Sequence, residues 1–93
     1  MLILPIKKKW YDMILSGEKK EEYREIKPYY TSRFPSSFES FYVMFRNGYS
    51  KNSPSFIAVC TLSIGHGHPE WGAEPNKKYY ILHIVEIKII NSE

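Results

Sequence analysis

The residues best suited to chemistry lie between Gly17 and Arg24, where the sequence reads G-x-K-x-x-E-x-R. Gly17 fits the end of a helix, because glycine adopts a left-handed backbone without the penalty that a Cβ brings. The residues after it predict a strand over 20–26. Side chains alternate along a strand, so Glu22 and Arg24 are expected on one face, with Lys19 at the strand entrance. Together these groups could bind an anion, orient a base edge or polarise a carbonyl.

The position of Lys19 depends on the turn before this strand. Strict alternation back from Glu22 brings Lys20, and not Lys19, onto the face that carries the motif. Lys19 joins the other two side chains only if the turn after the glycine is still unfinished one residue later. As a purely structural feature, the glutamate and the arginine would form an exposed ion pair worth about 0–1 kcal/mol.

Other candidate contact residues are aromatic or cationic. Tyr29 and Arg33 follow the strand in a segment, 28–37, that reads as irregular and is too polar for a core. An exposed aromatic ring beside a guanidinium suits base stacking, worth ~1–3 kcal/mol per base. Tyr29 or Tyr30 could instead cap an open barrel end. Trp71 lies in a glycine-rich loop and could be a stacking platform or a plug over the barrel end.

His66 and His68 form an H-x-H pair in the loop 65–72. Either could act as a general base, because imidazole titrates near neutral pH. A zinc site needs three or four protein ligands, and no further ligand is close in the sequence. We therefore expect no metal and no cofactor, and the role of the two histidines stays open. The run Lys7, Lys8 and Lys9 could contact phosphates or form a solvated helix start.

The hydrophobic pattern predicts mainly strands around these residues. Five segments rich in β-branched and aromatic residues predict strands: 2–6, 20–26, 38–45, 55–64 and 78–90. Residues 8–16 have apolar side chains at helical spacing, and Asn47-Gly48 predicts a type I′ turn. Alternation puts Tyr79, Ile81 and Val85 on one face of the last strand. A sheet of so few strands protects its edges best when it closes into a small β-barrel or bends strongly. We therefore expect an α+β, mainly β fold: a small β-barrel or strongly bent sheet of about five or six strands with one or two short helices.

Length and composition favour one small domain over residues 1–93. The sequence is 43% hydrophobic and 16% aromatic, which supports a folded core. Its net charge of +3 is compatible with a polyanionic partner. The single cysteine, Cys60, cannot form an internal disulfide and suits a reducing compartment. No signal peptide and no apolar run of ~20 residues is seen, so we expect a soluble, cytoplasmic protein with no membrane association.

The order of a first strand, a short helix and then Gly17, Lys19, Glu22 and Arg24 resembles the ASCH (ASC-1 homology) domain family of the PUA-like superfamily. All four motif positions match. The family's length and strand order fit nearly the whole chain, and the match is sharpest over residues 1–33. The loop at Trp71 resembles, more weakly, a cleft-side loop of some members. The resemblance implies a β-barrel-like fold with a cleft beside the motif and a role in RNA binding.

One branch of that family hydrolyses N4-acylated cytidine and carries a threonine where this chain has Glu22. The hydroxyl of its lysine-activated nucleophile is therefore missing here. We expect an RNA- or nucleoside-binding domain with a basic cleft. Its expected ligand contacts are Lys19, Glu22, Arg24, Tyr29, Arg33 and Trp71. Two alternatives stay open: a hydrolase of acylated nucleosides or of RNA, with Lys19 and Glu22 catalytic, and a protein-interaction module.

Overall fold

The computed structural model describes residues 1–36 and 39–91 of the chain. Its elements are β1 (Leu2–Ile6), α1 (Lys8–Leu15), β2 (Glu21–Arg24), α2 (Pro28–Thr31), β3 (Phe41–Asn47), β4 (Ser55–His66), the 3-10 turn η1 (Pro69–Trp71) and β5 (Lys78–Asn91). Each predicted strand is present, with differences at the ends. Phe38, the first residue of the predicted third strand, lies outside the described residues.

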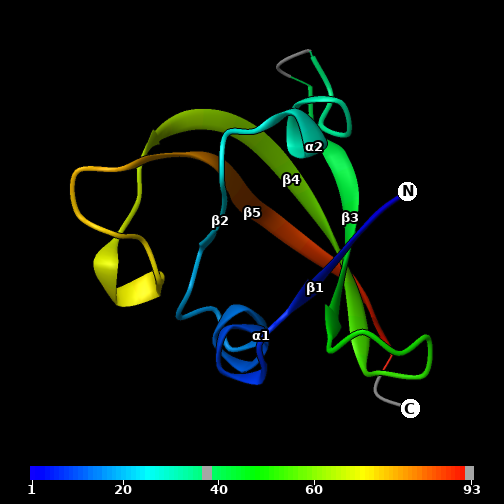
Figure 1. Ribbon diagram of the computed structural model, residues 1–93. Helices are drawn as coiled ribbons and strands as arrows, with labels where there is room; N and C mark the ends of the chain where they lie inside the picture. The colour runs from blue at the N-terminus through cyan, green and yellow to red at the C-terminus, as the bar shows by residue number, and fades with distance from the viewer. Residues whose placement is uncertain (37–38, 92–93) are drawn as a thin grey trace.

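One five-stranded sheet, in the order β1-β3-β4-β5-β2, forms the body of the molecule. β1 runs parallel to β3, and all other neighbours are antiparallel. Figure 1 shows the long strands β4 and β5 bending strongly. The two edge strands approach closely enough for Arg24 Nη2, on β2, to donate to the Pro5 carbonyl, on β1, at 3.0 Å. The fold is α+β and mainly β, a strongly bent sheet or partial barrel with two short helices, as predicted.

The core lies on the concave side of this sheet. Alternate side chains of three strands are buried there: Leu4, Ile6, Val43, Phe45, Phe56, Ala58 and Cys60. Helix α1 adds Tyr11 and Ile14, and the ring centroid of Tyr11 lies 5.0 Å from that of Phe56. Because α1 packs against one end of the curled sheet (Figure 1), it fixes the point from which β2 starts.

β5 departs from simple alternation at two bulges. Between the Cys60–Ile84 pair and the Val59–Glu86 pair, β5 has one extra residue, Val85, and a second register shift follows further along the strand. Val85 is 61% exposed. The single face predicted for this strand is therefore wrong beyond its first half. A bulge reverses the alternation and increases the local twist, which helps so small a sheet to curl.

Two loop predictions are wrong. The segment 28–37 begins with a short helix, α2, with Pro28 in its first turn, where the missing N–H has no partner to lose. A type I′ turn needs positive φ at both central residues, but of Asn47 and Gly48 only Gly48 has it, at +112°. Asn47 belongs to β3, and residues 48–54 join it to β4, which starts at Ser55 as predicted.

Candidate functional site

The turn between α1 and β2 determines where Lys19 points. Gly17 ends the helix in the left-handed region (φ +85°), and the backbone N–H of Lys19 donates to the Met13 carbonyl at 2.9 Å. The chain is therefore still turning at Lys19, which is the condition that the sequence set for Lys19 to join the motif face. Lys19 is 1% exposed and pairs with Glu22, whereas Lys20 is exposed.

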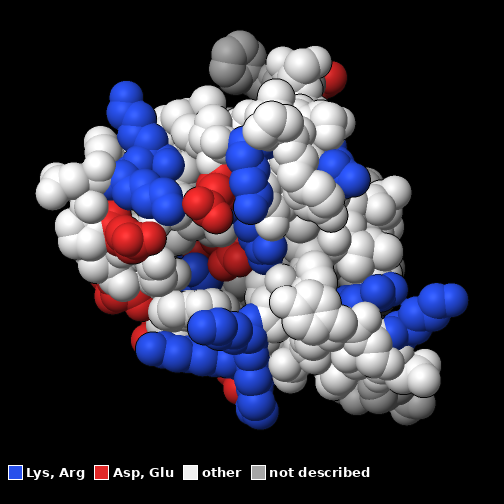
Figure 2. Space-filling model, in the orientation of Figure 1, with Lys and Arg blue, Asp and Glu red and all other residues white. Residues whose placement is uncertain are grey.

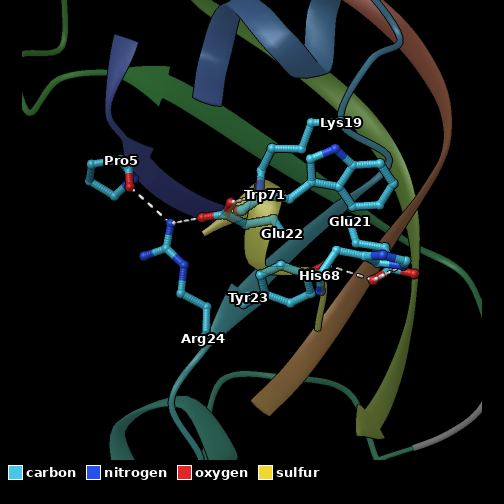
Figure 3. Close-up of polar contacts among 8 residues, drawn as sticks. All are labelled: Pro5, Lys19, Glu21, Glu22, Tyr23, Arg24, His68 and Trp71. Atoms are coloured by element: carbon cyan, nitrogen blue, oxygen red, sulfur yellow. Dashed lines mark hydrogen bonds and ion pairs between the residues drawn. The ribbon is translucent and has the colours of Figure 1, made fainter. Parts of the chain in front are cut away.

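Glu22 lies between two cations. Its Oε1 is 3.3 Å from Lys19 Nζ, and its Oε2 accepts a hydrogen bond from Arg24 Nη2 at 2.9 Å. Glu22 is 6% exposed, so this carboxylate is almost as buried as the amine. Figure 3 shows Glu22 and Arg24 pointing to the same side of β2, as the alternation along the strand predicted. The three side chains form one ion-pair network with Glu22 at its centre.

Lys19 is enclosed on every side that the structure describes. Its Nζ donates to the Trp71 carbonyl at 2.5 Å and lies 4.7 Å and 4.8 Å from the ring centroids of Trp10 and Tyr23. Burial lowers the pKa of the Lys19 amine below its ordinary value, although the neighbouring Glu22 acts in the opposite direction. This lysine therefore supports Glu22 from behind and contacts solvent very little.

Arg24 holds the two edges of the sheet together. Its Nη2 donates both to Glu22 and to the Pro5 carbonyl, and its Nη1 donates to the Tyr30 hydroxyl at 3.2 Å. Its Nε is buried and has no hydrogen-bond partner among the described residues. A buried donor without a partner costs about 1–3 kcal/mol. Hydrogen bonds to β1, β2 and α2 thus position the arginine firmly.

A cleft of about 400 Å³ opens beside Glu22 and Arg24. The rest of its lining is Pro5, Ile6, Lys7, Lys8, Trp10, Asn47, Gly48 and Tyr49. The start of α1 therefore supplies two lysines and an aromatic ring to one wall, while the loop after β3 supplies Tyr49 to the other. Figure 2 shows basic side chains around a hollow in the middle of this face. Lys19 lies behind the cleft and does not line it.

A second cleft adjoins the first, and a third adjoins the second. The second is lined by Pro5, Arg24, Lys27, Tyr29, Tyr30 and Tyr49. The third is lined by Met1, Leu2, Ile3, Leu4, Tyr29 and Arg33. The structure thus brings Tyr29 and Arg33 to the same side of the molecule as the motif. It also adds Lys27 and Tyr49, which the sequence did not single out.

Trp71 is not among the described residues that line these clefts. Its ring lies 4.5 Å from the His68 ring, and its backbone carbonyl accepts the hydrogen bond from Lys19. Trp71 therefore acts on the motif through Lys19. The aromatic ring that does line the cleft is that of Trp10, which the sequence assigned only to the apolar face of the helix.

The opposite side of β2 carries a separate polar cluster. The Tyr23 hydroxyl donates to Glu21 Oε1 at 2.8 Å and accepts from the backbone N–H of His68 at 2.9 Å. His66 is held elsewhere, with Nδ1 3.1 Å from the Lys77 carbonyl. The two histidines therefore do not converge. Within residues 1–36 and 39–91, no three His, Cys, Asp or Glu side chains gather as a metal site.

Comparison of the chain with models of known protein families, with curated proteins and with solved structures finds no match. In the part of the chain that the structure describes, no helix has both the length and the apolar character needed to cross a membrane.

Proposed function

We propose that this protein is an ASCH-type, PUA-like domain that binds RNA, or a nucleoside-sized part of it, in the cleft beside Glu22 and Arg24. One observation carries the proposal: a carboxylate and a guanidinium, held 2.9 Å apart, form part of a cleft whose walls carry lysines and aromatic rings. Base edges present donors and acceptors side by side, and a nucleotide adds a ring face and a phosphate. The cleft has a matching group for each of these.

The roles follow from the geometry of the cleft. Glu22 accepts a hydrogen bond from a base amino group. The positive charge of the Arg24 guanidinium attracts a carbonyl or phosphate oxygen of the ligand. Tyr49, which is 89% exposed, offers a ring face on which a base stacks, and Trp10 forms part of the apolar wall. Lys7 and Lys8 are exposed at the start of α1 and contact phosphate oxygens.

The energetic balance of the motif supports a functional origin. Buried ion pairs are weak evidence for stability, because the loss of hydration rivals the attraction between the charges. The Lys19–Glu22–Arg24 network is largely buried and leaves the Arg24 Nε without a partner among the described residues. A domain selected for stability alone would do as well with apolar residues at these positions.

The geometry favours binding over hydrolysis. A lowered pKa would suit Lys19 as an activating base, but its amine is enclosed by Trp10, Tyr23 and the Trp71 carbonyl and lies behind the cleft. A protein-interaction module would use exposed apolar side chains such as Val85, Ile89 and Ile90 on β5. We rank that alternative below RNA binding because the cleft beside the motif is cationic.

We place this activity in the cytoplasm. The thiol of Cys60 is fully buried, and burial raises its pKa to about 12, which keeps it protonated and unreactive. A single buried thiol needs no oxidising compartment for folding.

A titration with CMP and with a short single-stranded RNA tests the proposal, with tryptophan fluorescence, to which Trp10 beside the cleft contributes, as the readout. Binding should weaken as salt is added, with a log–log slope of ~0.7 for each phosphate contacted. Lys7→Ala and Lys8→Ala should each reduce affinity and lower that slope. Lys78→Ala, an exposed lysine on β5 outside these clefts, is the matched control. Absence of binding at low salt, or equal effects of all three substitutions, would reject RNA binding at this cleft.

A further inference from the structure

We propose that the ligand is a single strand of about four nucleotides, and that its flanking nucleotides bind a second tract formed by Lys27, Tyr29 and Arg33. This inference rests on the function proposed above and adds to it the form and length of the RNA. The tract lies on α2 and the residues that flank it, outside the cleft of the ion-pair network.

The three clefts join into one groove. The first and second share Pro5, Arg24 and Tyr49, and the second and third share Tyr29. β1 contributes residues to all three, so the groove follows this edge strand from the start of α1 toward the N-terminus. At about 3.3 Å per residue, the five residues of β1 span roughly 16 Å. That length suits a few extended nucleotides, near the lower end of the ~4–16 nucleotides that small single-strand binding folds cover.

Cations occur along the whole groove. Lys7 and Lys8 lie at one end, Arg24 and Lys27 in the middle, and Arg33 at the other end. Phosphates recur along an extended strand, so a groove with cations at intervals fits a polymer better than one isolated nucleotide.

Tyr29 is a pre-arranged stacking platform within this tract. Its side chain is 54% exposed, and the Arg33 guanidinium carbon lies 3.6 Å from its ring centroid. Arg33 Nη1 also donates to the Tyr29 carbonyl at 2.7 Å, which fixes the arginine over the ring. The edge of the Tyr29 ring meets Tyr30, which stacks on the buried Phe34. The platform is therefore anchored to the core, so little side-chain freedom is lost when a base stacks on it.

The same features select single-stranded RNA. A base can stack on Tyr29 or reach Glu22 only when its face and edge are free, and in a duplex both are covered by neighbouring and paired bases. Tyr49, at 89% exposure, adds a further ring between the first two clefts.

The test measures affinity against length. CMP and labelled cytidine–uridine oligomers of about two to eight nucleotides would be titrated by fluorescence anisotropy or competition, with a blunt RNA duplex of the same sequence in parallel. We expect affinity to rise up to about four nucleotides and then level off. Tyr29→Leu should lower tetramer affinity about fivefold or more, as the loss of ~1–3 kcal/mol of stacking requires. Arg33→Gln, which removes a cation from the tract, should also lower tetramer affinity, and both variants should leave CMP affinity unchanged. Both residues are exposed, so the variants should fold.

Conservative variants separate chemistry from structure. Tyr29→Phe keeps the ring and Arg33→Lys keeps the charge, so Tyr29→Phe should restore most of the tetramer affinity and Arg33→Lys part of it. Lys78→Gln, distant from the groove, should have no effect. CMP binding that does not strengthen with length would overturn this inference and leave the proposed function intact. So would a length effect that both Tyr29→Leu and Arg33→Gln retain, or duplex binding as tight as single-strand binding. Failure of CMP and all oligomers to bind would overturn both.

Discussion

Replacing Glu22 by glutamine should destabilise the protein more than removing the lysine that it pairs with. Glu22→Gln keeps the shape of the side chain but leaves the Lys19 amine, 1% exposed, without its counter-charge. Breaking a buried pair in this way costs about 3–5 kcal/mol. An upper limit follows from the pKa: releasing the proton of an ordinary lysine at pH 7 costs about 5 kcal/mol, at 1.36 kcal/mol per pH unit. We therefore expect a loss of roughly 3–5 kcal/mol.

Lys19→Met should cost less, about 1–2 kcal/mol. The methionine fills the space between Trp10 and Tyr23, and Glu22 keeps its hydrogen bond from Arg24. The main loss is the hydrogen bond to the Trp71 carbonyl. In the double variant the buried amine that made Glu22→Gln costly is gone. The double variant should therefore be more stable than Glu22→Gln alone.

Urea unfolding followed by the fluorescence of Trp10 and Trp71 measures all three free energies of unfolding. For a chain of this size, 3 kcal/mol corresponds to a fall in Tm of about 12–24 °C, which thermal unfolding can check independently. Additive effects of Glu22→Gln and Lys19→Met would refute the reasoning, because independent sites add and coupled sites do not. A Glu22→Gln variant within about 1 kcal/mol of the wild type would refute it too, since an exposed pair behaves in that way.

Three further predictions concern the loop between β4 and η1, the buried Lys19 amine and the enzymatic alternative. Gly67→Ala should destabilise the protein by about 1–3 kcal/mol, because a Cβ at this position would lie 2.5 Å from the Tyr23 ring. Gly65→Ala is the control: its Cβ would lie 3.5 Å from the nearest atom, so this variant should lose clearly less stability in the same unfolding assay. The pKa of Lys19 is lowered from 10.5 in the folded protein, so between the lowered value and 10.5 the unfolded chain binds more protons than the folded chain. The stability of the wild type relative to Lys19→Met should therefore rise as the pH approaches 10.5. A fall in this relative stability would contradict the direction of the pKa shift. Incubation with N4-acetylcytidine should yield cytidine only at background level; turnover abolished by both Lys19→Met and Glu22→Gln would instead make the protein a nucleoside amidohydrolase.

The first quarter of the fold was predictable because its signals are local. Alternation fixed the common direction of Glu22 and Arg24, and Gly17 marked the helix end. The direction of the Lys19 side chain depended on one backbone hydrogen bond, from the Lys19 N–H to the Met13 carbonyl, which extends the turn as far as Lys19. The sequence could state that condition but had no means to decide it.

The rest depended on contacts between distant segments. Val85 lies at a bulge that is defined by pairing with β4, and an uninterrupted apolar run gives no sign of it. The positions of Trp71 and Trp10 relative to the cleft also depend on contacts between distant segments. The backbone carbonyl of Trp71, in the loop, accepts a hydrogen bond from Lys19, while Trp10, on the helix, lines the cleft. Tyr49 carried a usable signal, as an aromatic residue in a polar loop, and it lines two of the clefts.

Mapping of backbone amide shifts during titration with a short single-stranded RNA tests the central claim most directly. If the cleft binds RNA, the amides of Lys7, Lys8, Glu22 and Arg24 should shift together in a saturable, salt-sensitive way, followed by those of Tyr29 and Arg33 as the RNA is lengthened. Glu21 and His68 face the other side of β2 and should change little. Shifts concentrated around Glu21 and His68, or no saturable shifts at low salt, would contradict the assignment of this cleft as an RNA site.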